Sequence, residues 1–197
     1  MSAGPIGQAE GLALTTFAVA AVREGLLNRF AEPAEPAEDM LRDPGASFVT
    51  LERVGRLRGC IGTIVAQRPL YQDVVRNALR AMRDPRLPPV VRDDWPELDV
   101  KVSVLTPPEP MPVNNRDTLL AELCPGEDGL LLTDGYRRAT FLPAVWEKLP
   151  EPHRFLDHLL VKGGWPAGGW PPGLAVSRYR SIEFANPAPR EPLPEFL

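Results

Sequence analysis

A single thiol lies within a run of residues whose types suit a binding or reactive site, Arg56-Leu57-Arg58-Gly59-Cys60-Ile61-Gly62-Thr63. If this run forms one extended strand, the alternation of side chains places Arg56, Arg58 and Cys60 on the same face. Two guanidinium groups beside a thiol would favour the thiolate, the form that attacks electrophiles and binds metals. The run therefore predicts a site with Cys60 as candidate nucleophile and with Arg56 and Arg58 as candidate ligand contacts.

The two glycines beside the thiol admit more than one interpretation. Gly59 and Gly62 leave room for a ligand or a second backbone to come close. They can equally mark a β-bulge or a crowded packing contact. Because a free cysteine is often a small buried hydrophobe, a structural role for Cys60 is the alternative to a reactive one. We include Gly59, Gly62 and Thr63 among the candidate ligand contacts.

A further candidate contact follows the next helical segment. The run Asp84-Pro85-Arg86-Leu87-Pro88-Pro89 could hold Arg86 at a ligand. The end of a helix followed by a rigid loop accounts for its prolines equally well. We therefore add Arg86 to the candidate ligand contacts.

The remaining metal-binding residue types are sparse. His153 and His158 are the only histidines, and five residues along a helix turn them roughly 140° apart, so one metal ion cannot readily use both. A dyad of Cys60 with one histidine is possible in principle, although nothing in the spacing requires it. The sequence has no Walker phosphate loop, no dinucleotide-binding glycine fingerprint and no paired-cysteine motif. We expect no metal and no cofactor.

Composition limits the class of protein. A chain of 197 residues with 44% hydrophobic content can bury a core without disulfides. Its net charge of −4 argues against general affinity for nucleic acid or anionic membranes. Two widely separated cysteines, Cys60 and Cys124, suit a reducing compartment, and the apolar segment 11–22 is too short to span a bilayer. We expect a cytoplasmic protein.

Hydrophobic periodicity and turn residues indicate the elements that position the candidate site. The first half of the chain predicts a helix over 8–30, a connector over 32–38, a hairpin of strands 46–53 and 56–63, a helix from 69 to about 82, and a strand over 98–104. After a stiff segment with prolines at 107–112, the second half predicts a helix near 118–123, a hairpin of 130–133 with 136–141, helices from 143 and over 153–162, and a strand over 174–184. Strands joined by hairpins and separated by helices favour an α+β fold of two subdomains with mostly antiparallel sheets flanked by helices.

Four motifs in order resemble one known family. They are Leu57-Arg58-Gly59-Cys60-Ile61-Gly62-Thr63, Asp84-Pro85-Arg86-Leu87-Pro88-Pro89, Val102-Ser103-Val104-Leu105-Thr106-Pro107-Pro108-Glu109 and Arg138-Ala139-Thr140-Phe141-Leu142-Pro143. The chain resembles the AMMECR family, whose microbial members are called AmmeMemoRadiSam system protein A, over nearly everything from Gly7 to Phe184. The resemblance implies one domain over 1–185 made of two α+β subdomains, with the smaller one at roughly 60–112, followed by a flexible tail over 186–197.

The resemblance suggests a pathway more than a reaction, because the family has no established biochemical activity. Microbial members are encoded beside a Memo-like protein and a radical SAM enzyme, so we expect a binding or accessory component that acts with these partners. Two alternatives stay open: a Cys60-dependent transferase or hydrolase, and an RNA-interacting module using the arginines and tyrosines of 136–138 and 178–180. Asp128 stands where relatives commonly have histidine, and Lys101 where many have glutamate, which weighs against a mechanism that needs those groups.

Overall fold

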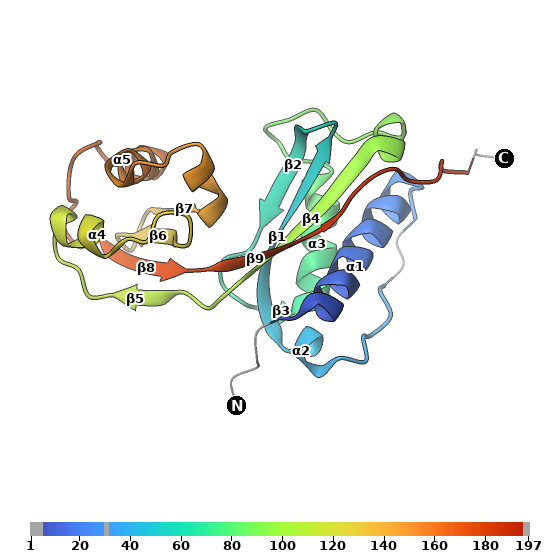
Figure 1. The fold of residues 1–197 in the computed structure, drawn as a ribbon, viewed down its shortest axis with the longest axis horizontal. Helices are drawn as coiled ribbons and strands as arrows, with labels where there is room; N and C mark the ends of the chain where they lie inside the picture. Colours follow the sequence, from blue (N-terminus) through green and yellow to red (C-terminus); the bar gives the residue numbers. More distant parts are fainter. Residues whose placement is uncertain (1–5, 30–31, 195–197) are drawn as a thin grey trace. The chain divides into compact units, whose positions relative to one another are not determined.

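The computed structural model describes residues 6–29 and 32–194, and they form two compact units (Figure 1). Unit 1 combines the chain up to Leu105 with the C-terminal segment from Ile182, and unit 2 is the continuous stretch Thr106–Ser181. Helices and antiparallel sheets are both present in the described residues, so the predicted α+β class is confirmed.

Unit 1 is built on a sheet with the strand order β2-β1-β4-β9, and β3 pairs with the start of β1. The strands are β1 (Pro44–Arg53), β2 (Arg56–Gly62), β3 (Arg68–Pro69), β4 (Leu98–Leu105) and β9 (Ser181–Asn186). β1 pairs antiparallel with β2, β3 and β4. The helical elements of this unit are α1 (Gln8–Leu26), α2 (Asp39–Arg42), α3 (Leu70–Ala81) and the 3-10 helix η1 (Arg92–Glu97).

One face of this sheet carries the core of unit 1. α3 packs against β1 and β2, and α1 packs against α3 and β4 (Figure 1). The inward positions of the two central strands are apolar at every second residue, as Val49, Leu51, Val100 and Val102 are fully buried. Apart from the buried pair of Ala46 and Leu105, the opposite positions of these two strands are polar or half-buried, so the sheet presents a second face away from α1 and α3.

The predicted hairpin leading into β2 is confirmed. Val54 and Gly55 form its two-residue turn with φ angles of 49° and 72°, the positive values that a type I′ turn requires. A β-branched residue rarely adopts such an angle, and Val54 is held there because both strands continue directly from the turn.

Unit 2 has its own sheet, of strand order β5-β8-β6-β7, and its own apolar core. Its strands are β5 (Glu109–Met111), β6 (Gly129–Thr133), β7 (Arg138–Phe141) and β8 (Ala175–Tyr179), and its helical elements are α4 (Arg116–Glu122), η2 (Pro143–Glu147) and α5 (Pro152–Lys162). Trp146 stacks on Phe155 with ring centroids 3.8 Å apart. Trp165 is also buried in this core, and its indole N–H donates a hydrogen bond to Asp134.

Three expectations about organisation need correction. The strand predicted over 174–184 is two strands, since β8 belongs to the sheet of unit 2 and β9 to that of unit 1. Residues 60–105 are not part of a smaller subdomain, because β4 is hydrogen-bonded to β1; the smaller unit is 106–181. The predicted helix over 8–30 ends at Leu26, and Phe30 lies outside the described residues.

The segment after β9 is held against unit 1 as far as residue 194, where a flexible tail was expected. The Arg190 guanidinium donates to the carbonyl of Leu98 and lies 5.2 Å from the Trp95 ring centroid. The Trp95 indole in turn donates to the carbonyl of Glu191 at 2.8 Å. These contacts fix the segment through side chain to backbone hydrogen bonds, which strand and helix patterns do not reveal.

Candidate functional site

Cys60 lies on β2 with its side chain on the sheet face away from α1 and α3. It is paired with Thr50 of β1, and directly opposite residues of an antiparallel pair share a face. The Thr50 hydroxyl lies 3.3 Å from the Cys60 sulfur, to which it donates. Lys101 of β4 pairs with Thr50 from the other side, so Cys60, Thr50 and Lys101 form a polar row across three strands.

Lys101 is surrounded by carboxylates on this face. Its ammonium lies 2.9 Å from Glu52, and the hydrogen bond that it donates to this carboxylate raises the pKa of Lys101 against the opposing effect of burial, with Glu183 and Asp99 adding to the rise. Lys101 therefore carries its charge at neutral pH and does not serve as a neutral nucleophile. The cation at this position is neutralised by its acidic neighbours.

The expectation that Arg56, Arg58 and Cys60 share a face is wrong because β2 contains a bulge. Gly59 pairs with Leu51 and Leu57 pairs with Glu52, so Arg58 has no partner on β1. After this extra residue the alternation is inverted, and Arg56 pairs with Arg53 on the helix-facing side of the sheet.

Arg58 is engaged by a buried carboxylate away from the sulfur. Its guanidinium lies 2.7 Å from Asp94 Oδ2 and also donates to the carbonyl of Pro89. Asp94, with 3% of its side chain exposed, binds Arg53 as well. Burial raises the pKa of Asp94, but hydrogen bonds from the Val91 backbone N–H and from Arg58 and Arg53 lower it by more, so the net shift is downward. Arg58 thus joins η1 to the hairpin.

Arg86 does meet Cys60, through the backbone of that residue. The Arg86 guanidinium donates to the Cys60 carbonyl at 2.9 Å, while the Cys60 N–H donates to Asp84 at 3.1 Å. Arg86 also forms an ion pair with the same carboxylate at 2.6 Å. These hydrogen bonds lower the pKa of Asp84, with the Arg86 side chain contributing most. Asp84 and Arg86 therefore satisfy the N–H and the C=O of Cys60 at the outer edge of β2, as the backbone of a neighbouring strand would.

This edge arrangement explains the close contact on the sheet face. Because the N–H and C=O of Cys60 both point outward to Asp84 and Arg86, Cys60 and Thr50 form a non-hydrogen-bonded pair. Side chains approach more closely in such pairs, which fits the 3.3 Å distance from hydroxyl to sulfur.

The two glycines of the motif serve close packing. A Cβ on Gly59 would lie 1.9 Å from the carbonyl oxygen of Ala81, at the end of α3. A Cβ on Gly62 would lie 2.1 Å from the ring of Phe48, its partner on β1. Both positions are filled by protein atoms, and the bulge of β2 lies directly before Gly59, so the structure supports the crowded packing contact at both glycines and the β-bulge beside Gly59.

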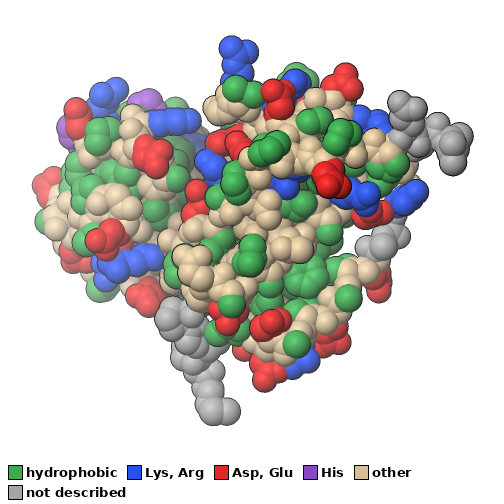
Figure 2. All heavy atoms as spheres, turned by 45° about the vertical axis from the view of Figure 1, so that its right-hand side comes forward, with side chains coloured by type: hydrophobic (Ala, Val, Ile, Leu, Met, Phe, Trp, Pro, Cys, Tyr) green, Lys and Arg blue, Asp and Glu red, His purple; other side chains and the backbone are tan. Residues whose placement is uncertain are grey.

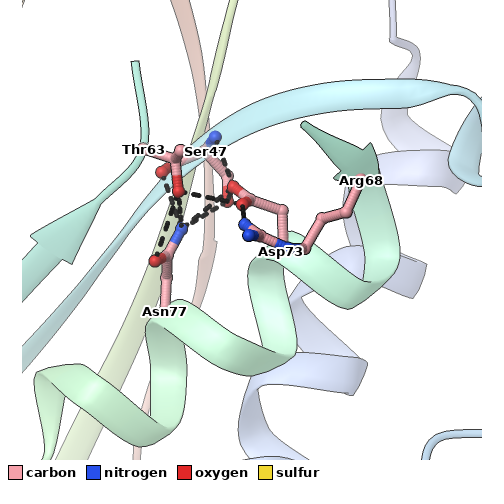
Figure 3. A network of polar contacts seen from close by, with 5 residues as sticks. All are labelled: Ser47, Thr63, Arg68, Asp73 and Asn77. Carbon is pink, nitrogen blue, oxygen red and sulfur yellow. Dashed lines mark hydrogen bonds and ion pairs between the residues drawn. The ribbon is translucent and has the colours of Figure 1, made fainter. Parts of the chain in front are cut away.

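Thr63 belongs to a separate buried network at the end of β2 (Figure 3). Its hydroxyl donates to Asp73 at 2.8 Å, and the same carboxylate accepts from Arg68 at 2.7 Å. Ser47 donates to the other oxygen through both its N–H and its hydroxyl, and Asn77 donates there at 2.9 Å. Because each group finds a partner, the network anchors α3 to the start of β1 and leaves no unpaired group to bind a ligand.

The structure thus brings together only part of the predicted set. Cys60 and Arg86 meet, Arg58 and Thr63 are engaged by other carboxylates, and Arg56 is exposed on the opposite side. Sequence reasoning missed Thr50, Lys101, Asp84 and Asp94 as neighbours, because strand register and loop placement bring them there. For Lys101, the alternation of polar and apolar residues over 98–104 could have predicted a side chain on the polar face of the sheet.

The histidines and the second cysteine do not form a cluster that could act as a site. His153 and His158 are both exposed on α5 of unit 2, and Cys124 is exposed in the same unit. Within residues 6–29 and 32–194, no three histidine, cysteine or acidic side chains gather in a way that could hold a metal ion. In the same part of the chain, no helix combines the length and apolar character needed to cross a membrane.

Comparisons with known proteins agree with this architecture. A protein of Methanothermobacter thermautotrophicus is 35% identical over 192 residues, which cover 93% of this chain and 98% of the relative. A protein of Thermotoga maritima is 39% identical over 152 residues, covering 75% and 82% of the two chains. The crystal structure of the uncharacterized protein PH0010 from Pyrococcus horikoshii matches with a TM-score of 0.87 at 30% identity, over 95% of this chain and 96% of that one. The model of the AMMECR1 family matches residues 15–184, and the chain therefore belongs to the AMMECR1 family.

Proposed function

We propose that this protein is a binding component that acts with a Memo-like protein and a radical SAM enzyme. The choice of partners comes from the genomic setting of related microbial proteins. The protein's own contribution would be to hold a small polar ligand, or a polar group of a partner, on the sheet face around Cys60. We place this activity in the cytoplasm, where the free thiols of Cys60 and Cys124 stay reduced.

The observation that carries the proposal is the polar row of Cys60, Thr50 and Lys101 across the face away from α1 and α3. A thiol that accepts from a hydroxyl, beside an ion-paired lysine, offers hydrogen-bonding groups at fixed spacing on a rigid sheet. Binding sites commonly combine a rigid scaffold with a few placed polar groups. The row therefore supports recognition of a polar group.

The same geometry ranks binding above thiol catalysis. The two arginines that would have favoured the thiolate are directed away from the sulfur, and Arg86 is neutralised by Asp84. A reactive cysteine needs an electropositive surrounding. The nucleophile hypothesis predicts rapid alkylation, so iodoacetamide labelling of Cys60 in a Cys124→Ser background tests it: we expect a rate no higher than that of a free model thiol across pH 6–9.

A pair of matched variants tests the site in the complex. In a mixture of the three purified proteins under reducing, anaerobic conditions, we expect Cys60→Ser to lower the rate at which the radical SAM enzyme cleaves S-adenosylmethionine, without preventing assembly. Cys124→Ser, the change at the other free thiol, should leave this rate unaltered. Equal rates for wild type and Cys60→Ser would remove Cys60 from the proposed function.

A further inference from the structure

The outward side of α3 carries two parallel rows of side chains of different character. Arg76 and Arg80 are exposed one helical turn apart, and exposed Arg83 follows in the turn after the helix. The half-buried apolar residues Val75 and Leu79 form the adjacent row. Residues four apart lie about 6 Å from each other along a helix axis, so both rows have the same spacing.

The three arginines differ from most others in unit 1 because they have no acidic partner. Arg53, Arg58 and Arg68 are all ion-paired, whereas no carboxylate among residues 6–29 and 32–194 lies within 4.0 Å of Arg76, Arg80 or Arg83. The only acidic residue of α3 itself is Asp73, which is fully buried and already bonded to Arg68. In a chain of net charge −4, this row is a local positive surplus.

The rows border a hollow surface. A groove of about 600 Å³ runs along α3 and is lined by Glu32, Pro33, Arg68, Tyr71, Gln72, Val75, Arg76, Leu79 and Arg80. A second groove of about 810 Å³ shares Val75 and Leu79 with it and continues along α1, where Leu12 is 63% exposed. In the first groove Glu32 stands against Arg76 and Arg80, because Arg68 is bonded to Asp73. The second groove carries Glu24, Glu32 and Glu38 with Arg29, so the positive surplus is confined to the α3 side of the surface.

We propose that this surface docks an acidic amphipathic helix of a partner protein. Carboxylates spaced four residues apart would reach Arg76 and Arg80, whose planar guanidinium groups bind carboxylates in bidentate fashion. The apolar side chains between those carboxylates would contact Val75 and Leu79. Helix-in-groove recognition uses apolar anchors at this spacing.

Nucleic acid fits the same surface less well. Single-stranded nucleic acid needs exposed aromatic rings for stacking, but Tyr71, the aromatic residue in the lining, is 7% exposed and packs against Phe17 with ring centroids 5.7 Å apart. Over the face shown in Figure 2, basic and acidic side chains are interspersed, with no broad field of one sign. An acidic polypeptide is therefore the occupant that these features favour.

The inference rests on the proposed function, because it names the surface through which the Memo-like protein or the radical SAM enzyme would be bound. The test measures by isothermal titration the dissociation constant of this protein with the Memo-like protein and, separately, with the radical SAM enzyme, at 50 and 500 mM NaCl. We expect Arg76→Glu with Arg80→Glu to weaken binding at least about tenfold at low salt, since like charges then face each other. The wild-type complex should also weaken with salt more steeply than the variant complex.

The control is Arg138→Glu with Arg154→Glu, which makes the same charge change at exposed arginines of unit 2 and should alter the constant less than about twofold. Equal thermal midpoints would show that both double variants remain folded. A complex that forms equally well with the α3 variant would overturn the inference and leave the proposed function standing. No complex with wild type would overturn both, and α3-dependent binding of oligouridine in place of protein would assign the row to nucleic acid and contradict the inference.

Discussion

At the scale of single residues, the motif around Cys60 serves the packing of a hairpin against a helix. Gly59 lets the carbonyl of Ala81 come close to β2, and Gly62 lies under the ring of Phe48. The sequence allowed ligand clearance, a β-bulge and crowded packing as interpretations of these glycines, and it could not decide among them. The distance from a glycine to the end of α3 depends on tertiary packing, which local sequence does not encode.

The contact at Gly59 yields a prediction. Replacing Gly59 with alanine places a Cβ 1.9 Å from a backbone carbonyl, which α3 can relieve only by moving. We expect a loss of about 1–3 kcal/mol or more in the free energy of unfolding, measured by urea titration. Gly169→Ala is the control, because its nearest neighbour would be 3.4 Å away and its φ angle is ordinary. An unchanged urea midpoint for Gly59→Ala would contradict this account of the motif.

At the scale of elements, register decides which side chains meet. The sequence correctly indicated the hairpin of β1 and β2, the helix α3 and the strand β4, because each has a clear periodicity and clear turn residues. It allowed a bulge beside Gly59 but did not show that Arg58 is the extra residue, which inverts the alternation and sends Arg56 to the other face. The strand predicted over 174–184 failed similarly, since no residue type marks its division at Arg180.

The edge of β2 gives a prediction about pH. The pKa of Asp84 is lowered in the folded protein, mainly by Arg86, so its contribution to stability is complete above the unfolded pKa of about 3.9 and is lost as pH falls through the lower folded value. We expect the urea midpoint to fall between pH 6 and pH 3, and to fall less for Asp84→Asn, which has no carboxylate to protonate. Asp93→Asn, which removes an exposed carboxylate of η1, should behave as wild type. An equal fall for wild type and Asp84→Asn would refute this role.

At the scale of the whole molecule, unit 2 is an insertion into unit 1. The chain enters and leaves it side by side, since the N–H of Thr106 donates to the carbonyl of Arg180 at 2.8 Å and the N–H of Arg180 donates to the Thr106 hydroxyl at 2.8 Å. The prolines of 107–112 marked one of these two boundaries. The second boundary lies between β8 and β9, where the sequence pattern is that of one uninterrupted strand. The local sequence therefore did not predict it.

This organisation predicts that unit 2 folds alone. Residues 106–181 contain a core with fully buried Leu130, Leu132, Phe155 and Leu159. Because this unit is one continuous stretch of chain, it can be expressed as a single fragment. We expect the isolated fragment to give dispersed amide resonances and a cooperative thermal transition. A fragment with random-coil spectra would show that the unit depends on the rest of the chain.

The central claim is that this protein works by binding partner proteins, and the most direct measurement is their assembly from purified components. This protein would be mixed anaerobically with the proposed partners, a Memo-like protein and a radical SAM enzyme from the same organism, and the mixture would be analysed by size-exclusion chromatography with light scattering. We expect a complex whose mass includes this protein and at least one of the two proposed partners, and we expect this complex to dissociate as the salt concentration is raised. Three separate peaks at every protein concentration up to about 100 µM, where even weak transient complexes are populated, would contradict the claim.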